Sequence, residues 1–268
     1  MHHRISVSTL NFPGTDLATI LTILGDLTIT RTTVQGSLMK THGWERSIAQ
    51  IIGSGITVDA LIAPYPHTLA DRATWSQSGE DITRTIEAAA EIGAPSVYTV
   101  TGPLLRDRAH SLAQLVEFLT PQVDRARDAG IRLALEATLP SFAAVSFVHT
   151  VAAARPLLDE LDMGLCLDLY HLWDDPDLAD WLAHDANNTL LCQIGDCVVD
   201  GDQRPKTPLG KGVIPLADRI GAVAASGYSG AFDIELTPST FITADDIVSV
   251  VGDATNYLDD VLTQVLPG

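Results

Sequence analysis

Four side chains that can bind a hard metal ion end four separate strand-like segments of this sequence. They are Glu136 in IRLALEATLP, Asp168 in MGLCLDLYHLW, Gln193 in LLCQIGD and Glu235 in AFDIELTP. Three carboxylates and one amide oxygen form an oxygen-rich ligand set that suits Mn²⁺ or Mg²⁺. If the four strands share one barrel, these side chains converge on one divalent ion that can hold a sugar carbonyl and its neighbouring hydroxyl. The sequence therefore predicts carbonyl-activating chemistry.

The elements that must position these residues follow a regular alternation. Short β-rich runs alternate with longer helical patterns, which favours a parallel sheet built of βα units. Eight candidate strands cover residues 4–10, 27–34, 57–63, 96–101, 131–136, 163–168, 190–194 and 231–236. Amphipathic stretches lie between them, as at 111–129, where Leu112, Leu115 and Leu119 recur at helical spacing. We therefore expect an α/β fold, a single (β/α)8 TIM barrel that forms one domain over residues 1–268.

The four candidate ligands all fall where a predicted strand ends. In a βα barrel the reactive groups cluster at the carboxyl ends of the strands, because the loops there can vary without disturbing the core. The two-residue period of a strand places Ala134 with Glu136, and Cys166 with Asp168, on one side of their strands. We expect that side to be the barrel interior.

Three carboxylates in one cavity would repel one another, and a cation is their natural compensation. Alternatively, each acid caps the following helix or pairs with an arginine. His171 follows Asp168 by three residues, beyond the strand, where it can reach substrate oxygens held by the metal. We expect Glu136 and Glu235 to transfer protons and His171 to contact the substrate. Asp233 is expected to support the site or to pair within the core.

Further candidates for substrate binding lie in three loops. The segment DQRPKTPLGKGVIPL contains Arg204 and Lys206, which can bind a substrate hydroxyl, carboxylate or phosphate; a solvated loop is the alternative. Its Gly-x-Gly turn is weak evidence for phosphate binding, because no glycine-rich nucleotide fingerprint follows the first strand. His67 follows the third strand and can line the pocket, while Trp173 forms a pocket wall or packs under the next helix.

The composition limits the partners of this chain. With 268 residues, 46% of them hydrophobic, the chain can bury one large core. Its 34 acidic and 16 basic residues give a formal charge of −18, which opposes contact with nucleic acid or anionic lipid. Neither a bilayer-spanning apolar stretch of roughly 18 residues nor the apolar core of a signal peptide is evident. Cys166, Cys192 and Cys197 lack the paired spacing of a zinc site, so we expect a reduced, cytoplasmic protein.

The segments LALE, GLCLDLYHLWDDPDL, QIGD, LGKGVIPL and GYSGAFDIEL together resemble the xylose isomerase-like TIM-barrel superfamily, often labelled sugar phosphate isomerases/epimerases. The resemblance is strongest over residues 131–238. It implies that Glu136, Asp168, Gln193 and Glu235 are the metal ligands and that His171 contacts the substrate. It also implies a divalent cofactor, for which we expect Mn²⁺, with Mg²⁺, Co²⁺ or Zn²⁺ as alternatives.

Two departures distinguish this chain from parts of the superfamily. Many epimerases carry His at the position of Gln193, whereas Gln there is more similar to dehydroshikimate dehydratases. In one similar subgroup a Pro and then a His follow the strand-five glutamate, and Ala137 and Leu139 stand in those places here. If that His is the proton-transfer base of the subgroup, its chemistry does not carry over to this chain. The endonuclease branch needs more His and acidic ligands, and its DNA would meet a charge of −18.

We expect a metal-dependent isomerase or epimerase that acts on a small carbohydrate, a ketose or a related polyol ketone, through an enediolate intermediate. One alternative is a lyase, a dehydroshikimate-type dehydratase or a C-glycoside deglycosidase subunit, in which the same enolate expels a leaving group protonated by His171, Arg204 or Lys206. Another is a non-catalytic or partner-dependent sugar-binding subunit, which the absence of His at Leu139 favours. Such barrels often form homo-oligomers, but no segment here specifies an interface or a small partner subunit.

Overall fold

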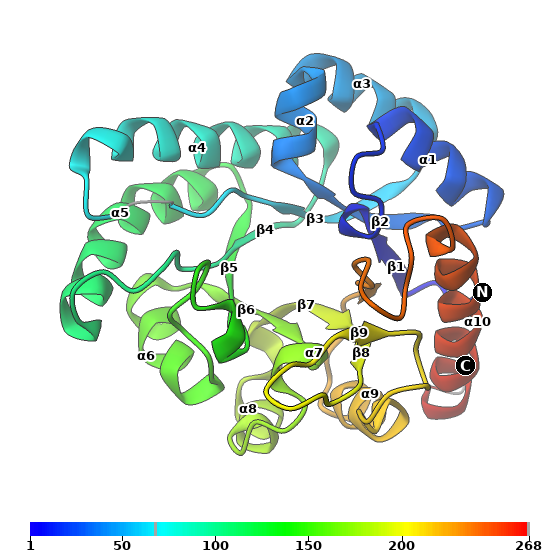
Figure 1. Cartoon of the computed structure of the whole chain (residues 1–268). Helices are drawn as coiled ribbons and strands as arrows, with labels where there is room; N and C mark the ends of the chain where they lie inside the picture. Colours follow the sequence, from blue (N-terminus) through cyan, green and yellow to red (C-terminus); the bar gives the residue numbers. More distant parts are fainter. Residues whose placement is uncertain (67–68, 267–268) are drawn as a thin grey trace.

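Eight parallel strands close into one barrel in the computed structural model, which describes residues 1–66 and 69–266. Their order around the barrel is β1-β10-β7-β6-β5-β4-β3-β2. The strands are β1 (Ile5–Ser8), β2 (Arg31–Gln35), β3 (Thr57–Ile62), β4 (Ser96–Thr99), β5 (Arg132–Glu136), β6 (Gly164–Asp168), β7 (Thr189–Ile194) and β10 (Phe232–Ile234). Figure 1 shows the helices arranged outside this ring of strands. The structure confirms the predicted α/β fold, a single (β/α)8 TIM barrel.

Helices connect successive strands along the outside of the barrel. They are α1 (Leu17–Asp26), α2 (Gly36–His42), α3 (Trp44–Ser54), α4 (Trp75–Ile92), α5 (Arg108–Asp128), α6 (Val151–Leu161), α7 (Leu169–Leu172), α8 (Leu178–His184), α9 (Leu216–Ala225) and α10 (Ile247–Val265). Short 3-10 turns are η1 (Thr9–Asn11), η2 (Arg72–Thr74), η3 (Pro140–Phe142) and η4 (Ala186–Asn188). Side chains of Asp16, Asp107 and Thr150 accept backbone N–H bonds at the starts of α1, α5 and α6, which fixes where these helices begin.

Each predicted strand overlaps an observed one, but every boundary pair differs by at least one residue, and two differences affect the argument. The strand predicted at 27–34 begins too early, because Leu27 ends α1 and Thr28 adopts a positive φ of 57° before β2 starts at Arg31. The strand predicted at 231–236 ends at Ile234, so Glu235 is the first residue beyond β10. The helix predicted at 111–129 corresponds to α5.

Alternation along the strands separates an inner cluster from the main core. Outward-facing residues such as Leu135, Leu165 and Ile194 are fully buried against the helices, and each such side chain contributes about 1.5–3 kcal/mol of stabilisation. A second cluster fills part of the barrel interior; it consists of Ala60, Tyr98, Ala134, Cys166 and Leu191. The inward side predicted for Ala134 and Cys166 is therefore confirmed.

The remaining part of the interior is polar. Asp233 Oδ1 accepts a hydrogen bond from Ser6 Oγ across 2.7 Å, and its Oδ2 accepts one from Thr33 Oγ1 across 2.9 Å. These contacts confirm the pairing role expected for Asp233. Burial raises the pKa of this carboxyl well above its usual range, although the two hydroxyl groups oppose the shift.

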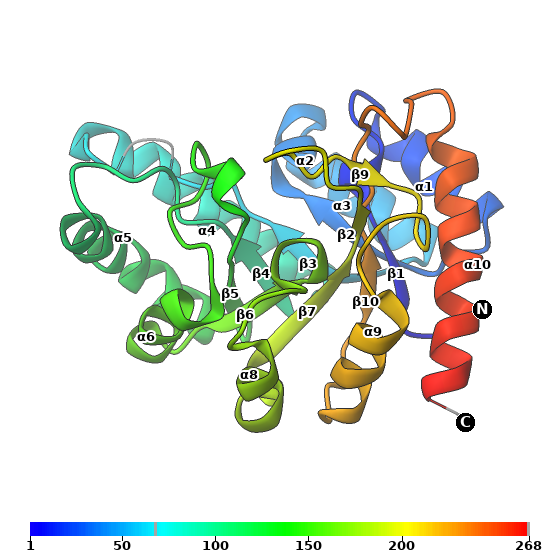
Figure 2. The same cartoon turned by 60° about the horizontal axis from the view of Figure 1, so that its bottom comes forward.

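A small antiparallel hairpin, β8 (Asp196–Cys197) and β9 (Lys206–Thr207), interrupts the connection that follows β7. The sequence does not predict it. Figure 2 shows β9 beyond the end of β7, on the side of the barrel where the strands terminate. The hairpin therefore adds side chains to the end of the barrel where the candidate ligands lie. No helix within residues 1–66 and 69–266 combines the length and apolar character needed to cross a membrane.

Candidate metal and substrate site

The ends of β5, β6, β7 and β10 bring the four predicted metal ligands to one end of the barrel interior. Asp168 ends β6 and is the register partner of Gln193 in β7. Asp168 and Gln193 are fully buried, and Glu136 and Glu235 are 9% exposed. The contacts of these side chains divide the site into two halves.

The first half, which we call the acidic cluster, consists of Glu136, Asp168 and His171. One ligand atom from each residue lies within 4.8 Å of the others. Nε2 of His171 is 3.4 Å from Oε1 of Glu136 and 3.6 Å from Oδ2 of Asp168. Helix α7 starts directly after β6, with Asp168 as its N-cap, and therefore carries His171 back over the strand end.

The orientation of the His171 ring is fixed by the chain that follows β5. The backbone N–H of Leu139 donates to Nδ1 of His171 across 3.1 Å. Nδ1 is therefore unprotonated, and the proton of the neutral ring lies on Nε2, which faces Glu136 and Asp168. A metal would need Nε2 to be unprotonated, so this geometry favours His171 as a hydrogen-bond donor.

Asp168 has one occupied and one unoccupied oxygen. Oδ1 accepts the backbone N–H of Tyr170 across 2.8 Å. Oδ2 is one of the few buried side-chain atoms in the described residues with no hydrogen-bond partner. A buried carboxylate oxygen without a partner is costly, and a bound cation would remove that cost.

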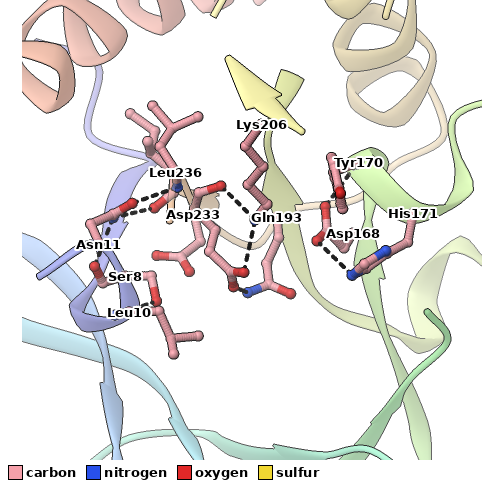
Figure 3. Close-up of polar contacts among 12 residues, drawn as sticks. Ser8, Leu10, Asn11, Asp168, Tyr170, His171, Gln193, Lys206, Asp233 and Leu236 are labelled. Carbon is pink, nitrogen blue, oxygen red and sulfur yellow. Dashed lines mark hydrogen bonds and ion pairs between the residues drawn. The ribbon is translucent and has the colours of Figure 1, made fainter. Parts of the chain in front are cut away.

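The second half, which we call the lysine cluster, consists of Lys206, Glu235 and Gln193. Nζ of Lys206 donates to Oε1 of Glu235 across 2.9 Å and to the Glu235 carbonyl across 2.8 Å. The other carboxylate oxygen of Glu235 accepts a bond from Nε2 of Gln193. Figure 3 shows Lys206 reaching from β9 toward Gln193, with Asp168 and His171 to one side. Both oxygens of Glu235 therefore already have partners.

The amide of Gln193 is held on both sides. Its Oε1 accepts the thiol of Cys166 across 3.0 Å, and its Nε2 also donates to the hydroxyl of Tyr98 across 3.0 Å. Burial raises the pKa of both the thiol and the phenol well above their usual values, so both groups stay neutral. The Gln193 oxygen faces Cys166, and the amide must turn before that oxygen can bind a metal.

Burial and mutual repulsion perturb the titration of the acidic cluster. Burial raises the pKa of Glu136 and of Asp168, and the other carboxylates of the site add to this rise while His171 opposes it. Burial lowers the pKa of His171, but the carboxylates of Asp168 and Glu136 outweigh that effect and raise it. Burial likewise disfavours the Lys206 ammonium, but Glu235 and Asp168 outweigh it and raise the pKa of Lys206. A group of perturbed pKa values in one cavity is typical of functional sites.

The Gly-x-Gly turn that follows β9 binds an anion from the chain itself. Oδ2 of Asp196 accepts the backbone N–H groups of Gly210 and Gly212 across 3.0 and 2.9 Å, and Oδ1 accepts that of Ile214 across 3.2 Å. These backbone N–H groups therefore already bind Asp196 and are not available to a substrate phosphate. Instead, Asp196 ties the turn to the hairpin that carries Lys206.

The other predicted substrate-binding residues have different surroundings. Lys206 is buried in the lysine cluster, whereas Arg204 pairs with Asp174 across 3.1 Å and its side chain is 29% exposed. Trp173 packs partly buried against the main core, and its buried indole N–H has no partner in the described part of the chain. His67 lies outside the described residues.

A depression of about 280 Å³ opens beside the acidic cluster. It is lined by Leu139, Pro140, Ser141, Val199, Gly201, Asp202 and Arg204. Leu139 contacts His171 through its N–H, and the Arg204 carbonyl accepts the hydroxyl of Tyr170 across 2.6 Å, so both walls join the site directly. The ring of Phe142 lies edge-on to His171 with centroids 5.0 Å apart. The depression therefore provides a partly apolar wall next to the ionisable groups.

Comparison with protein families identifies this architecture. The model that describes the xylose isomerase-like TIM barrel matches residues 36–251. The chain belongs to this family. The match also covers much of the N-terminal half, where the sequence carries few of the motifs that suggested the resemblance. No curated protein matches the chain.

Solved structures show the same xylose isomerase-like barrel at low sequence identity. A Sinorhizobium meliloti 1021 protein is 23% identical with a TM-score of 0.84, covering 97% of this chain and 98% of its own. IOLI protein with a bound zinc atom is 18% identical with a TM-score of 0.79, covering 98% and 99%. An L-ribulose 3-epimerase is 17% identical with a TM-score of 0.76, covering 98% and 95%. These likenesses establish the shared fold.

The residues of this xylose isomerase-like chain fit a divalent ion. Asp168 offers a buried oxygen that has no hydrogen-bond partner, and Glu136 lies beside it in the same cavity. Hard oxygen ligands of this kind suit Mn²⁺ and Mg²⁺, and they also accept Zn²⁺. The acidic cluster is therefore a candidate metal centre.

Four residues that shape this site were missed at the sequence level. They are Tyr98, Cys166, Tyr170 and Asp196. Tyr98 and Cys166 read only as apolar strand residues, and their contacts with Gln193 depend on the register between strands. A signal existed for Asp196, because the segment QIGD precedes a glycine-rich turn whose amides need an acceptor.

Proposed function

We propose that this protein is a divalent-metal-dependent isomerase or epimerase that acts on a ketose or a related polyol ketone. The observation that carries the proposal is Oδ2 of Asp168, a fully buried carboxylate oxygen that has no hydrogen-bond partner and lies 3.6 Å from Nε2 of His171. An arrangement that costs stability in the folded protein is typical of a binding or catalytic site. Family membership supports the same class of reaction, since an L-ribulose 3-epimerase shares the fold.

Glu136 and Asp168 would hold the metal from the acidic cluster, and Glu235 and Gln193 would complete its ligand set. When bound, the ion supplies Lewis-acid chemistry, which polarises a ketone and stabilises negative charge on its oxygen. Family membership supports a metal, because IOLI protein binds zinc. We propose Mn²⁺ as the working ion.

Glu136 and Glu235 would move the proton. They follow β5 and β10, which are separated in the barrel by β6 and β7, so they approach a bound substrate from different sides. A carboxylate on one side removes the C–H proton beside the ketone, and the other returns a proton to the opposite face or neighbouring carbon. Burial raises the pKa of Glu136, which makes its carboxylate a stronger base than an exposed one. General acid–base catalysis of this kind contributes roughly 10²- to 10⁴-fold.

His171 would donate a hydrogen bond to the substrate oxygen that gains negative charge. Its proton lies on Nε2 because Leu139 occupies Nδ1, and Nε2 faces the cavity between the two acids. The ring is also held by Phe142 and Tyr170, whose rings lie 5.0 and 4.7 Å from it. A donor held rigidly at the site of developing charge stabilises the transition state without reorganisation.

A lyase is the second candidate, and one observation favours it. Lys206 is a buried ammonium at the edge of the cavity, and it can protonate a leaving group expelled from the carbon next to the enolate. The enolate electron pair then forms the new C=C bond as the C–O bond breaks. Lys206 fits this role better than Arg204, which is paired with Asp174.

The test is proton exchange in D₂O. The Mn²⁺-loaded protein is incubated with ketoses, an inosose and dehydroshikimate, and the C–H signals are followed by NMR against the metal-stripped protein. We expect metal-dependent loss of the signal next to the ketone, with an isomer as product; an unsaturated product would identify the lyase. Glu136→Gln should abolish the exchange and Glu160→Gln, on the exposed side of α6, should not. Equal exchange with and without metal would refute the proposal.

A further inference from the structure

We infer that Lys206 is a built-in cation that competes with the divalent metal for Glu235 and thereby lowers the metal affinity of the site. This inference rests on the proposed function, because it assigns a role at the same centre. It concerns a residue that does not come from a barrel strand. Lys206 comes from the β8–β9 hairpin, whereas the acids come from the barrel strands.

The contacts of Lys206 are those of a fixed counter-ion. Its residue is 6% exposed, and its ammonium bonds both the carboxylate and the carbonyl of Glu235. The ammonium also lies 4.8 Å from the centre of the Tyr170 ring, a distance at which the ring face attracts a cation. A buried ammonium is costly unless it is paired, so these contacts hold it at Glu235.

Glu235 has no free carboxylate oxygen in this arrangement. Lys206 occupies Oε1, and the amide of Gln193 occupies Oε2. The oxygen of Gln193 is itself bound by the thiol of Cys166. Two of the four predicted ligands therefore already have hydrogen-bond partners within the protein, and an ion at Glu235 would have to share its carboxylate with Lys206 and Gln193.

The acidic cluster shows the opposite condition. Oδ2 of Asp168 has no hydrogen-bond partner, and Nε2 of His171 lies 3.6 Å from it, beyond hydrogen-bond distance. One half of the site is thus open to a cation while the other half already holds one. An ion at Asp168 and an ammonium at Glu235 repel each other across a buried cavity, where such repulsion is weakly screened.

The fold fixes the lysine in this position. Lys206 pairs with Cys197 across the hairpin, and Asp196 beside it accepts backbone N–H groups from Gly210, Gly212 and Ile214. These bonds tie both ends of the β9 connection to the end of β7. The ammonium is therefore delivered by an ordered hairpin, as expected for a residue with a defined role at the site.

The experiment measures Mn²⁺ affinity of the metal-stripped full chain by isothermal titration calorimetry and by the EPR signal of free Mn²⁺. Lys206→Met should bind Mn²⁺ more tightly by roughly tenfold or more, because the competing charge is removed. The matched control is Lys211→Met, the same change at an exposed residue of the neighbouring turn, and it should alter affinity less than about threefold. Circular dichroism confirms that each variant is folded.

A second background separates competition at Glu235 from general repulsion. In Glu235→Gln, the Lys206→Met change should improve affinity clearly less than it does in the wild-type background, since the contested carboxylate is gone and only the repulsion of an ion at Asp168 remains; equal gains in the two backgrounds would contradict competition at Glu235. If Lys206→Met does not fold, Lys206→Gln removes the charge while keeping a donor for the Glu235 carbonyl, and it should show the same gain. Wild-type binding with no gain in either variant would overturn this inference alone. Absence of Mn²⁺ binding in every protein would overturn the proposed metal function together with it.

Discussion

The backbone N–H of Leu139 donates to Nδ1 of His171 across 3.1 Å. Position 139 is where a similar subgroup of the superfamily is expected to carry a histidine. Here its main chain, instead of its side chain, acts on the site, because it sets which nitrogen of His171 carries the proton. The side chain of Leu139 is 6% exposed and packs in the core.

Leu139→Pro tests this bond. The φ of Leu139 is −58°, which proline adopts, so the substitution removes the N–H donor with little backbone strain. We expect the ring to populate both neutral tautomers and its pKa to rise further, since nothing then opposes a proton on Nδ1. Leu139→Ala, which truncates the same side chain and keeps the N–H, is the control. Ring ¹⁵N shifts measure the tautomer, and identical shifts in the two variants would contradict this account.

Asp168→Asn should exchange function for stability. The amide removes a buried charge and keeps an oxygen for the Tyr170 N–H. The free energy of unfolding of the metal-free variant should therefore exceed that of the wild type by about 1–3 kcal/mol. Its Mn²⁺ affinity should fall by roughly 100-fold or more. Urea unfolding and calorimetry measure the two effects. Asp245→Asn, at an exposed position, should change neither, and a destabilised Asp168→Asn protein would count against a strained carboxylate.

Gly212→Ala should disrupt the hairpin. A Cβ at this position would overlap the Asp196 carboxylate and the Cys197 carbonyl, so the turn must move away from its acceptor. We expect a loss of about 2 kcal/mol or more of unfolding free energy, together with altered Mn²⁺ affinity as Lys206 shifts. Gly201→Ala is the comparison: its φ is 58° but its surroundings are open, which predicts a loss of about 1–2 kcal/mol. Equal melting temperatures in both variants would argue against this role for Gly212.

Stability should decline with rising pH above 9 partly because of Cys197. Burial, followed by the Asp196 charge, raises the pKa of this thiol to about 11. The folded state therefore keeps the thiol proton that the unfolded chain loses near pH 9. The contribution of Cys197 to the free energy of unfolding is fully present below pH 9 and is lost as the pH rises to about 11. Cys197→Ala should flatten this part of the curve of unfolding free energy against pH. The same slope in variant and wild type would contradict the shift.

The fold could be predicted from the sequence because its signals are local. Eight strands, their alternation with helices and the inward side of Ala134 and Cys166 all follow from short-range patterns, and the closed barrel confirms them. The strand boundary at Leu27 was wrong for a physical reason. Apolar composition cannot distinguish a helix end from a strand start, and the positive φ of Thr28 leaves no mark in the sequence.

The candidate site could be predicted only in part. The placement of acids at strand ends brings Glu136 and Asp168 together, as expected from the register of parallel strands. The partners of Glu235 and Gln193 could not be predicted, because Lys206 lies 29 residues before Glu235 and Tyr98 lies 95 residues before Gln193. Such pairings depend on barrel closure and on a hairpin of two-residue strands too short to leave a pattern.

Because Lys206 lies on the β8–β9 hairpin, it can be gained or lost independently of the carboxylates on the barrel strands. Glu136 and Asp168 end barrel strands and Glu235 directly follows one, whereas Lys206 lies on a connecting hairpin, and connections vary more readily than barrel strands. A graft of residues 196–214 into another barrel of this family would transfer the lysine with its own anchor, Asp196, and its own glycines. Replacement of this loop would then change the metal affinity of a related barrel without moving its metal ligands.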